Sequence, residues 1–171
     1  SGAINYAGWF RALSQRMAKA YCQQYLQVLP GAAVDVMGLA RKMVQSGSNE
    51  LARGMQSGQW PADVGRQLAD VQKQFALLNQ LTAAPATQTA LVVAASEQAD
   101  RTLLVAQTVT ESIEKMAQAP SARLVNLAGR QRMLSQRLAK NYFLNAAKVE
   151  SKVVQAQLVA DAADFLSLIH I

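Results

Sequence analysis

Residues 4–21 of this chain read INYAGWFRALSQRMAKAY, and residues 125–142, which lie 121 positions later, read VNLAGRQRMLSQRLAKNY. Eleven of the eighteen positions are identical. An apolar pattern can be preserved with many residue choices, but this repeat preserves a glycine, two arginines, a glutamine and a lysine at fixed offsets. The repetition therefore indicates a shared task in addition to a shared fold.

Both copies have the spacing of an amphipathic helix, at about 100° per residue. The apolar face of the first copy, which belongs in a core, carries Tyr6, Phe10, Leu13, Met17 and Tyr21. The other face gathers Asn5, Gly8, Arg11, Ala12, Gln15 and Lys19, with Arg16 at its edge. The second copy places Leu127, Leu134 and Leu138 in the core. Its polar face carries Asn126, Gly129, Arg132, Met133, Gln136 and Lys140, with Arg137 in the place of Arg16.

The helical period continues along the chain, and no convincing strand is present. We expect helices over residues 3–28, 32–55, 61–84, 87–118, 121–147 and from 151 onward, with a break near 46–48 left open. Pro30-Gly31 should stop the first helix, and Ser121 should cap the fifth. The order predicts an all-α, up-and-down bundle of four long helices, a fifth that carries the repeat and a short sixth.

The direction of the fifth helix decides how the two copies meet. Short connections make successive helices antiparallel, so the fifth should run parallel to the first. The copies would then lie side by side about a pseudo-twofold axis within one chain. The alternative is that Pro120 only kinks a continuous rod, so that the second copy pairs with another chain and forms a homodimer.

Composition limits the class of protein. The net charge is +6, and residues 1–34 and 115–149 contain bases but no acid. Nucleic-acid binders usually spread Lys and Arg along an exposed face with aromatics for stacking, so we expect no nucleic-acid partner. No apolar stretch reaches the roughly eighteen residues that a membrane span needs, so no span is expected in this chain. The single cysteine, Cys22, rules out an internal disulfide, and no metal or cofactor is expected.

The duplicated glycine and arginine suggest an anion site. A glycine inside a helix costs about 1 kcal/mol relative to alanine, and close helix packing is sufficient to explain Gly8 and Gly129. Packing does not explain Arg11 and Arg132 one turn later, because two like charges repel unless something neutralises them. Neither copy contains an acid. Guanidinium groups are planar, always charged and forked, which suits a small oxyanion such as nitrate or nitrite.

We therefore expect Gly8, Arg11, Gly129 and Arg132 to form a ligand site. Neutral donors would come from the amides of Asn5, Asn126, Gln15 and Gln136. For Arg16 and Arg137, a place in this site and a solvated or ion-paired surface role are equally favoured. The reason is that Arg16 follows Arg11 by five residues, which places it roughly 140° away around the helix.

The pattern Asn-x-Ala-Gly-x-x-Arg-x-x-Ser-Gln-Arg, above all in residues 126–140, resembles the signature of the PilJ-type sensor domain. This domain is the N-terminal ligand-binding region of type IV pili methyl-accepting chemotaxis transducers. The pattern is similar also to the first-helix motif of the NarX and NarQ nitrate sensors. The first copy departs from it at Trp9, Phe10 and Ala12, where arginine, glutamine and methionine are usual.

The resemblance implies a helical bundle outside the inner membrane, hence a periplasmic location, although no signal peptide is visible. It implies that nitrate is held at a twofold interface by Arg11 and Arg132, beside Gly8 and Gly129. It also implies that residues 3–118 form a complete four-helix sensor bundle. Residues 119–171 would then begin a second, incomplete repeat that packs on the first or extends from it.

Two functions follow as hypotheses. The leading one is a sensory module in which a small oxyanion bridges paired arginines on parallel helices and so couples binding to helix movement. The alternative is a structural helical module for dimerisation or for docking a protein partner such as a pilus component. An enzyme is not expected, because Ser14 and Ser135 lack a neighbouring base, and His170, the one histidine, is terminal. The apolar end, residues 164–171, is either a truncation product or a docking element.

Overall fold

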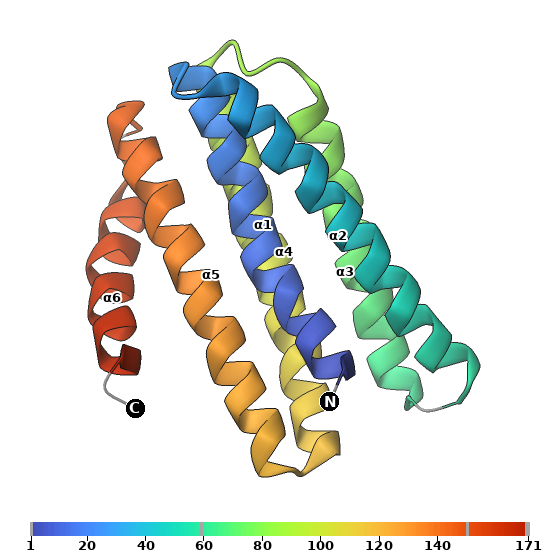
Figure 1. The fold of residues 1–171 in the computed structure, drawn as a ribbon. Helices are drawn as coiled ribbons and strands as arrows, with labels where there is room; N and C mark the ends of the chain where they lie inside the picture. Colours follow the sequence, from blue (N-terminus) through green and yellow to red (C-terminus); the bar gives the residue numbers. More distant parts are fainter. Residues whose placement is uncertain (1, 59, 150, 170–171) are drawn as a thin grey trace.

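The computed structural model describes residues 2–58, 60–149 and 151–169. It contains six helices: α1 (Gly2–Leu26), α2 (Pro30–Gln56), α3 (Ala62–Ala83), α4 (Thr89–Ala117), α5 (Pro120–Ala146) and α6 (Lys152–Ile169). The described residues include no strand. The prediction of an all-α, up-and-down bundle is confirmed (Figure 1). None of these helices is long and apolar enough to cross a membrane.

The helix ends next to Pro30 and Pro120 differ from those expected. Pro30 opens α2 instead of stopping α1, because Gln27 and Leu29 adopt left-handed conformations with φ of 57° and 46° and end α1 first. Helix α2 continues through residues 46–48 without a break. At the start of α5, Ala119 is the capping residue and Pro120 occupies the first turn, so the expected cap Ser121 lies inside the helix.

The glycine in the middle of α2, Gly47, allows close packing of this helix against α1 and does not interrupt the helix. Gly47 is buried, and a Cβ built on it would lie 3.2 Å from Cε1 of Phe10. The glycine thus lets the phenyl ring of α1 approach the α2 backbone, which outweighs its low helix propensity.

Helix α5 returns beside α1 and runs in the same direction (Figure 1). The connection is a turn: Gln118, with φ of 47°, ends α4, and Pro120 begins α5. The two copies of the repeat therefore pack against each other within one chain, as the loop count predicts.

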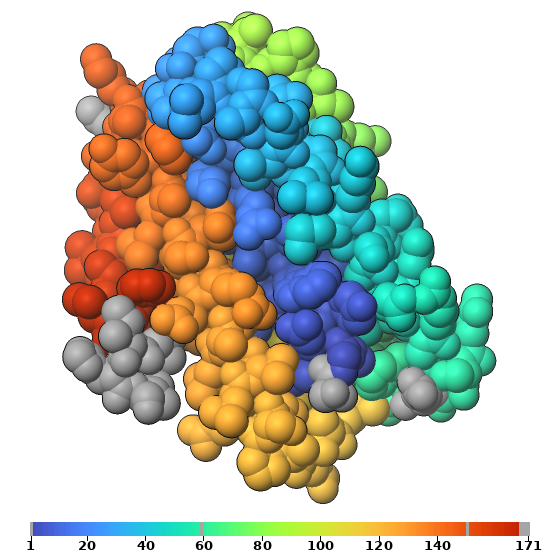
Figure 2. Space-filling model, viewed as in Figure 1, coloured from blue at the N-terminus to red at the C-terminus, as the bar shows by residue number. Residues whose placement is uncertain are grey.

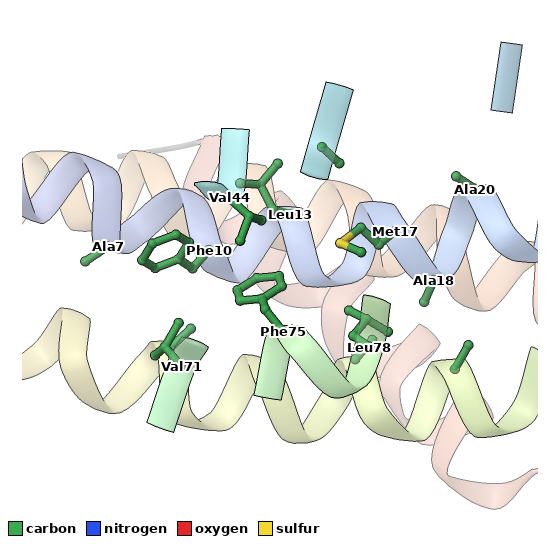
Figure 3. Packing of buried hydrophobic residues seen from close by; sticks show 14 of the residues in the cluster. Ala7, Phe10, Leu13, Met17, Ala18, Ala20, Val44, Val71, Phe75 and Leu78 are labelled. Carbon is green, nitrogen blue, oxygen red and sulfur yellow. The ribbon is translucent and has the colours of Figure 1, made fainter. Parts of the chain in front are cut away.

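Helix α1 is the central element of the bundle. It packs against α2, α4 and α5, and Figure 2 shows it as a narrow blue strip between α5 and α2. Its expected core residues Phe10, Leu13 and Met17 are buried. Figure 3 shows Phe10 of α1 facing Phe75 of α3, with ring centroids 5.6 Å apart. Helix α6 packs mainly against α5.

Candidate functional site

The position of α1 at the centre of the bundle buries its polar face as well as its apolar one. Arg11, Ser14 and Gln15 are each 0% exposed. A buried arginine is uncommon, because moving its charge out of water is costly unless partners compensate. The surroundings of Arg11 therefore define the site.

Gly8 and Gly129 face each other where α1 and α5 cross. A Cβ built on Gly129 would lie 3.7 Å from Cα of Gly8 and 2.6 Å from Nη2 of Arg11. A Cβ on Gly8 would lie 3.1 Å from the same Nη2 atom. The two glycines thus bring the helix backbones together and leave room for one guanidinium. We call the contact formed by Gly8, Arg11, Asn126 and Gly129 the α1–α5 seam.

Neutral oxygen atoms accept the hydrogen bonds of Arg11 in the seam. Its Nη2 donates to the backbone oxygen of Asn126 at 3.2 Å, and its Nε to that of Gly8 at 3.5 Å. Its Nη1 donates to Oε1 of Gln107 on α4 at 3.0 Å, and Gln107 in turn donates to Glu111. No carboxylate of the described residues lies within salt-bridge distance of Arg11.

The electrostatics of the seam are unfavourable for a cation. The pKa of Arg11 is lowered from 12.5 to about 10, chiefly by burial and also by the charges of Arg130 and Arg132. Glu114 and Glu111 oppose this shift and do not cancel it. The seam is therefore a place where an additional negative charge would be stabilised.

The amide residues expected as donors are distributed over several contacts. Asn126 is half-buried and donates through Nδ2 to Glu114 of α4, while its backbone oxygen accepts from Arg11. Asn5 is half-buried, and its side chain forms no hydrogen bond to the described residues. None of the four expected side-chain amides is hydrogen-bonded to the Arg11 guanidinium in the described structure, and Asn126 contacts it through its backbone oxygen.

The two glutamines lie further along the helices. Gln15 donates to the backbone oxygen of Ala99 on α4 at 3.3 Å, and its buried Oε1 has no hydrogen-bond partner among the described residues. Gln136 accepts a 2.7 Å hydrogen bond from Nζ of Lys19, which links the two copies a second time. Burial and the neighbouring Arg16 lower the pKa of Lys19.

Arg132 does not occupy the position equivalent to that of Arg11. It is exposed, and it lies with the half-buried Arg16 around one surface pocket between α1, α2 and α5. The two copies differ here because α4 packs mainly against α1, where its Gln107 bonds to Arg11, whereas Arg132 of α5 stays exposed.

The acids that the repeats lack come from other helices. Arg137 forms a bidentate ion pair with Asp161 of α6, with both N–O distances at 2.6 Å. Burial lowers the pKa of Arg137, but the hydrogen bond and charge of Asp161 raise it more, so the net shift is upward. Of the two roles weighed for Arg137, the structure places it in an ion pair and away from the seam.

Two further cations of the second copy are paired in the same way. Arg130 lies 3.2 Å from Asp164 of α6, and Lys140, which is fully buried, lies 2.6 Å from Asp100 of α4. Among the motif arginines, Arg11, Arg16 and Arg132 thus have no carboxylate partner in the described structure. Neither copy contains an acid of its own, but Arg130, Arg137 and Lys140 of the second copy pair with acids that lie many residues away in the sequence.

The fold and the motif define an all-helical bundle domain with a cationic seam between two parallel helices. The model of the PilJ family, described as the type IV pili methyl-accepting chemotaxis transducer N-terminal domain, matches residues 115–170. The match covers α5, which carries the second copy of the motif, and α6. It confirms the predicted resemblance to PilJ-type sensor domains for this segment. The family is one of chemotaxis transducer sensory domains. No curated protein and no solved structure is significantly similar to this chain.

Proposed function

We propose that this protein is a sensory domain that binds a small monovalent oxyanion, nitrate or nitrite, at the α1–α5 seam. Arg11 would hold the anion through its guanidinium fork, and Arg132 and Arg130 would contribute positive potential from the surface. The family of the matched segment supports the sensory role. The oxyanion is inferred from the chemistry of the seam.

One observation carries the proposal: Arg11 is 0% exposed and pairs only with neutral oxygens. A buried charge without a counter-ion destabilises the fold. If this position served packing alone, an apolar residue would be more favourable than arginine. A planar oxyanion accepts two parallel N–H bonds from a guanidinium. It would replace Gln107 Oε1 and the Asn126 backbone oxygen as acceptors, and its charge would offset the repulsion from Arg132.

Binding at this point would couple to helix movement. The guanidinium fills the space between Gly8 and Gly129, so an anion can enter only if α1 and α5 move relative to each other. A ligand shifts a conformational equilibrium by its difference in affinity for the two states. The seam with the anion bound would be one state, and the closed seam of the present structure the other. We propose a periplasmic location, on the resemblance alone.

The alternative, a structural docking module, is favoured by one observation. Helix α6 leaves three large apolar side chains in water: Val153 is 59% exposed, Val159 75% and Leu166 59%. Val159 and Leu166 lie on one face of α6, seven residues apart, and exposed apolar side chains on one face are typical of a helix that packs against another helix or a partner protein. This function does not exclude the first, because α6 contacts the other side of α5.

Calorimetric titration with nitrate tests the proposal. We expect saturable binding to the wild type, none to Arg11→Met, and several-fold weaker binding to Arg132→Ala. The exposed Arg123, on the same helix as Arg132, provides the control: Arg123→Gln should bind like the wild type. Equal affinity in Arg11→Met would remove the seam as the site. A ligand that binds only the folded state must raise the melting temperature. If millimolar nitrate and nitrite neither bind nor raise it, the structural docking module becomes the favoured function.

A further inference from the structure

A second cationic site lies on the face of the molecule shown in Figure 2, where α1 is flanked by α5 and α2. It is a pocket of about 220 Å³, separate from the seam. The residues around it are Trp9, Ala12, Leu13 and Arg16 of α1, Met43 of α2 and Arg132 of α5. Two guanidinium groups and several apolar side chains thus surround one cavity.

Neither arginine of this pocket has an acceptor in the described part of the chain. Arg16 and Arg132 donate no side-chain hydrogen bond and form no ion pair there, whereas Arg130 and Arg137 both reach carboxylates of α6. Two cations held beside one cavity repel each other, and an anion between them would remove that repulsion. The charges therefore select a negatively charged ligand.

The apolar part of the pocket comes from the positions where the two copies of the repeat differ. Trp9 stands where the second copy has Arg130, and Ala12 where it has Met133. The alanine leaves space that a methionine would fill, and the tryptophan adds a flat apolar surface. Tyr6 packs edge-on against Trp9, with ring centroids 5.0 Å apart and planes at 74°, and so restrains the indole.

We propose that this pocket binds a small carboxylate that carries a planar apolar body, such as an aromatic acid. The carboxylate would lie between Arg16 and Arg132, where guanidinium forks match its two oxygens. The ring would lie against Trp9, with Leu13 and Met43 at its edges. A bare inorganic oxyanion would use the charges but leave the apolar surface in water, which is why the ligand class differs from that of the seam. The volume is below that of drug-sized pockets, which begin near about 300 Å³, and so suits a one-ring acid.

The two tryptophans make a direct test possible. The chain contains only Trp9 and Trp60, and Trp60 lies at the α2–α3 connection, outside this pocket. In a ¹H–¹⁵N spectrum of the intact chain titrated with benzoate, the indole signal of Trp9 should shift saturably and that of Trp60 should not. Benzyl alcohol, which has the ring without the charge, should cause no comparable shift. Nitrate should bind here at least about tenfold more weakly than benzoate, because it forms no apolar contact.

Variants separate this site from the seam. Arg16→Gln and Arg132→Gln should each weaken benzoate binding by about tenfold, since each removes one charge-assisted contact. Ala12→Met restores the residue of the second copy and should fill the cavity and abolish binding. Arg123→Gln is the control for charge and should not change the affinity. Because the arginines Arg16 and Arg132 are at least partly solvent-exposed, their variants remain informative even if Ala12→Met unfolds the protein.

Three results would overturn the proposal. The first is that the indole signal of Trp9 does not shift with benzoate at about 10 mM, because a site that is still empty at this concentration binds too weakly to be functional. The second is an equal response to benzyl alcohol, which would mean that the charges play no part. The third is unchanged affinity in Arg16→Gln. The oxyanion proposal fails separately, on nitrate and Arg11→Met, so either site can be lost while the other stands.

Discussion

The guanidinium of Arg11 occupies the space that a side chain at Gly129 would need: its Nη2 atom lies 2.6 Å from the Cβ position of that glycine. Gly129→Ala should therefore destabilise the protein by about 1–3 kcal/mol, although alanine is the better helix former. Denaturant unfolding measures the change. The matched control is Gly38→Ala in α2, where a Cβ meets nothing within 4 Å; it should be neutral or stabilise by up to about 1 kcal/mol.

A double-mutant cycle shows whether Arg11 causes this cost. Combined with Arg11→Gln, which shortens the side chain, Gly129→Ala should lose most of its effect, with a coupling of at least about 1 kcal/mol. Additive effects would mean that backbone contact with Gly8, and not the arginine, requires the glycine.

The charge of Arg11 should contribute little to stability by itself. Removing a buried cation also removes its desolvation cost, which offsets the loss of its hydrogen bonds to the oxygens of Gln107 and Asn126. We expect Arg11→Met to change the free energy of unfolding by no more than about 1 kcal/mol, in either direction. Leu13→Ala, which removes a buried apolar side chain two residues away, should cost about 2–5 kcal/mol in the same assay. A loss in Arg11→Met as large as that in Leu13→Ala would show that Arg11 is structural.

The ion pair between Arg137 and Asp161 should hold α6 on α5. Asp161 is 1% exposed, so Asp161→Asn leaves a partly buried guanidinium without its counter-charge and should cost about 2 kcal/mol. Amide hydrogen exchange in α6 should accelerate. The control is Asp164→Asn, whose pair with Arg130 is 40–50% exposed and should cost at most about 0.5 kcal/mol. If the two variants behave alike, apolar packing alone holds α6.

The thiol of Cys22 should be inert in the folded protein. It is fully buried, and burial raises its pKa from 9.0 to about 12. Thiol reagents attack the thiolate, so Ellman's reagent should react only after unfolding. Above pH 9 the unfolded chain ionises this thiol while the folded chain does not, so stability should fall as the pH rises towards 12. Between pH 9 and 10 the wild type should lose about 1 kcal/mol more than Cys22→Ala. Equal losses would contradict the shift.

Much of the fold could be predicted from the sequence because helix periodicity and the turn residues are local signals. The direction of α5 followed from counting connections, and the apolar face of the first copy placed Phe10, Leu13 and Met17 correctly in the core. The boundary errors at Pro30 and Ser121 arose because proline opens a helix as readily as it ends one.

The site could be predicted only in part. The repeat singled out Gly8, Arg11 and Gly129, which the structure brings together in the seam. The partners of the second copy are long-range, since Asp100 and Asp161 lie 40 and 24 residues from the cations they bind. No spacing rule links such positions. The helical wheel likewise gave no sign that α4 would cover Arg11 through Gln107 and leave Arg132 exposed.

A crystal structure of the protein grown with saturating nitrate tests the central claim most directly. We predict a nitrate in the α1–α5 seam, with its oxygens within hydrogen-bond distance of the Arg11 guanidinium and with Gln107 released from Nη1. If Arg11 still donates to Gln107 and Asn126 and no anion lies between Gly8 and Gly129, the account of an oxyanion sensor at this seam is contradicted.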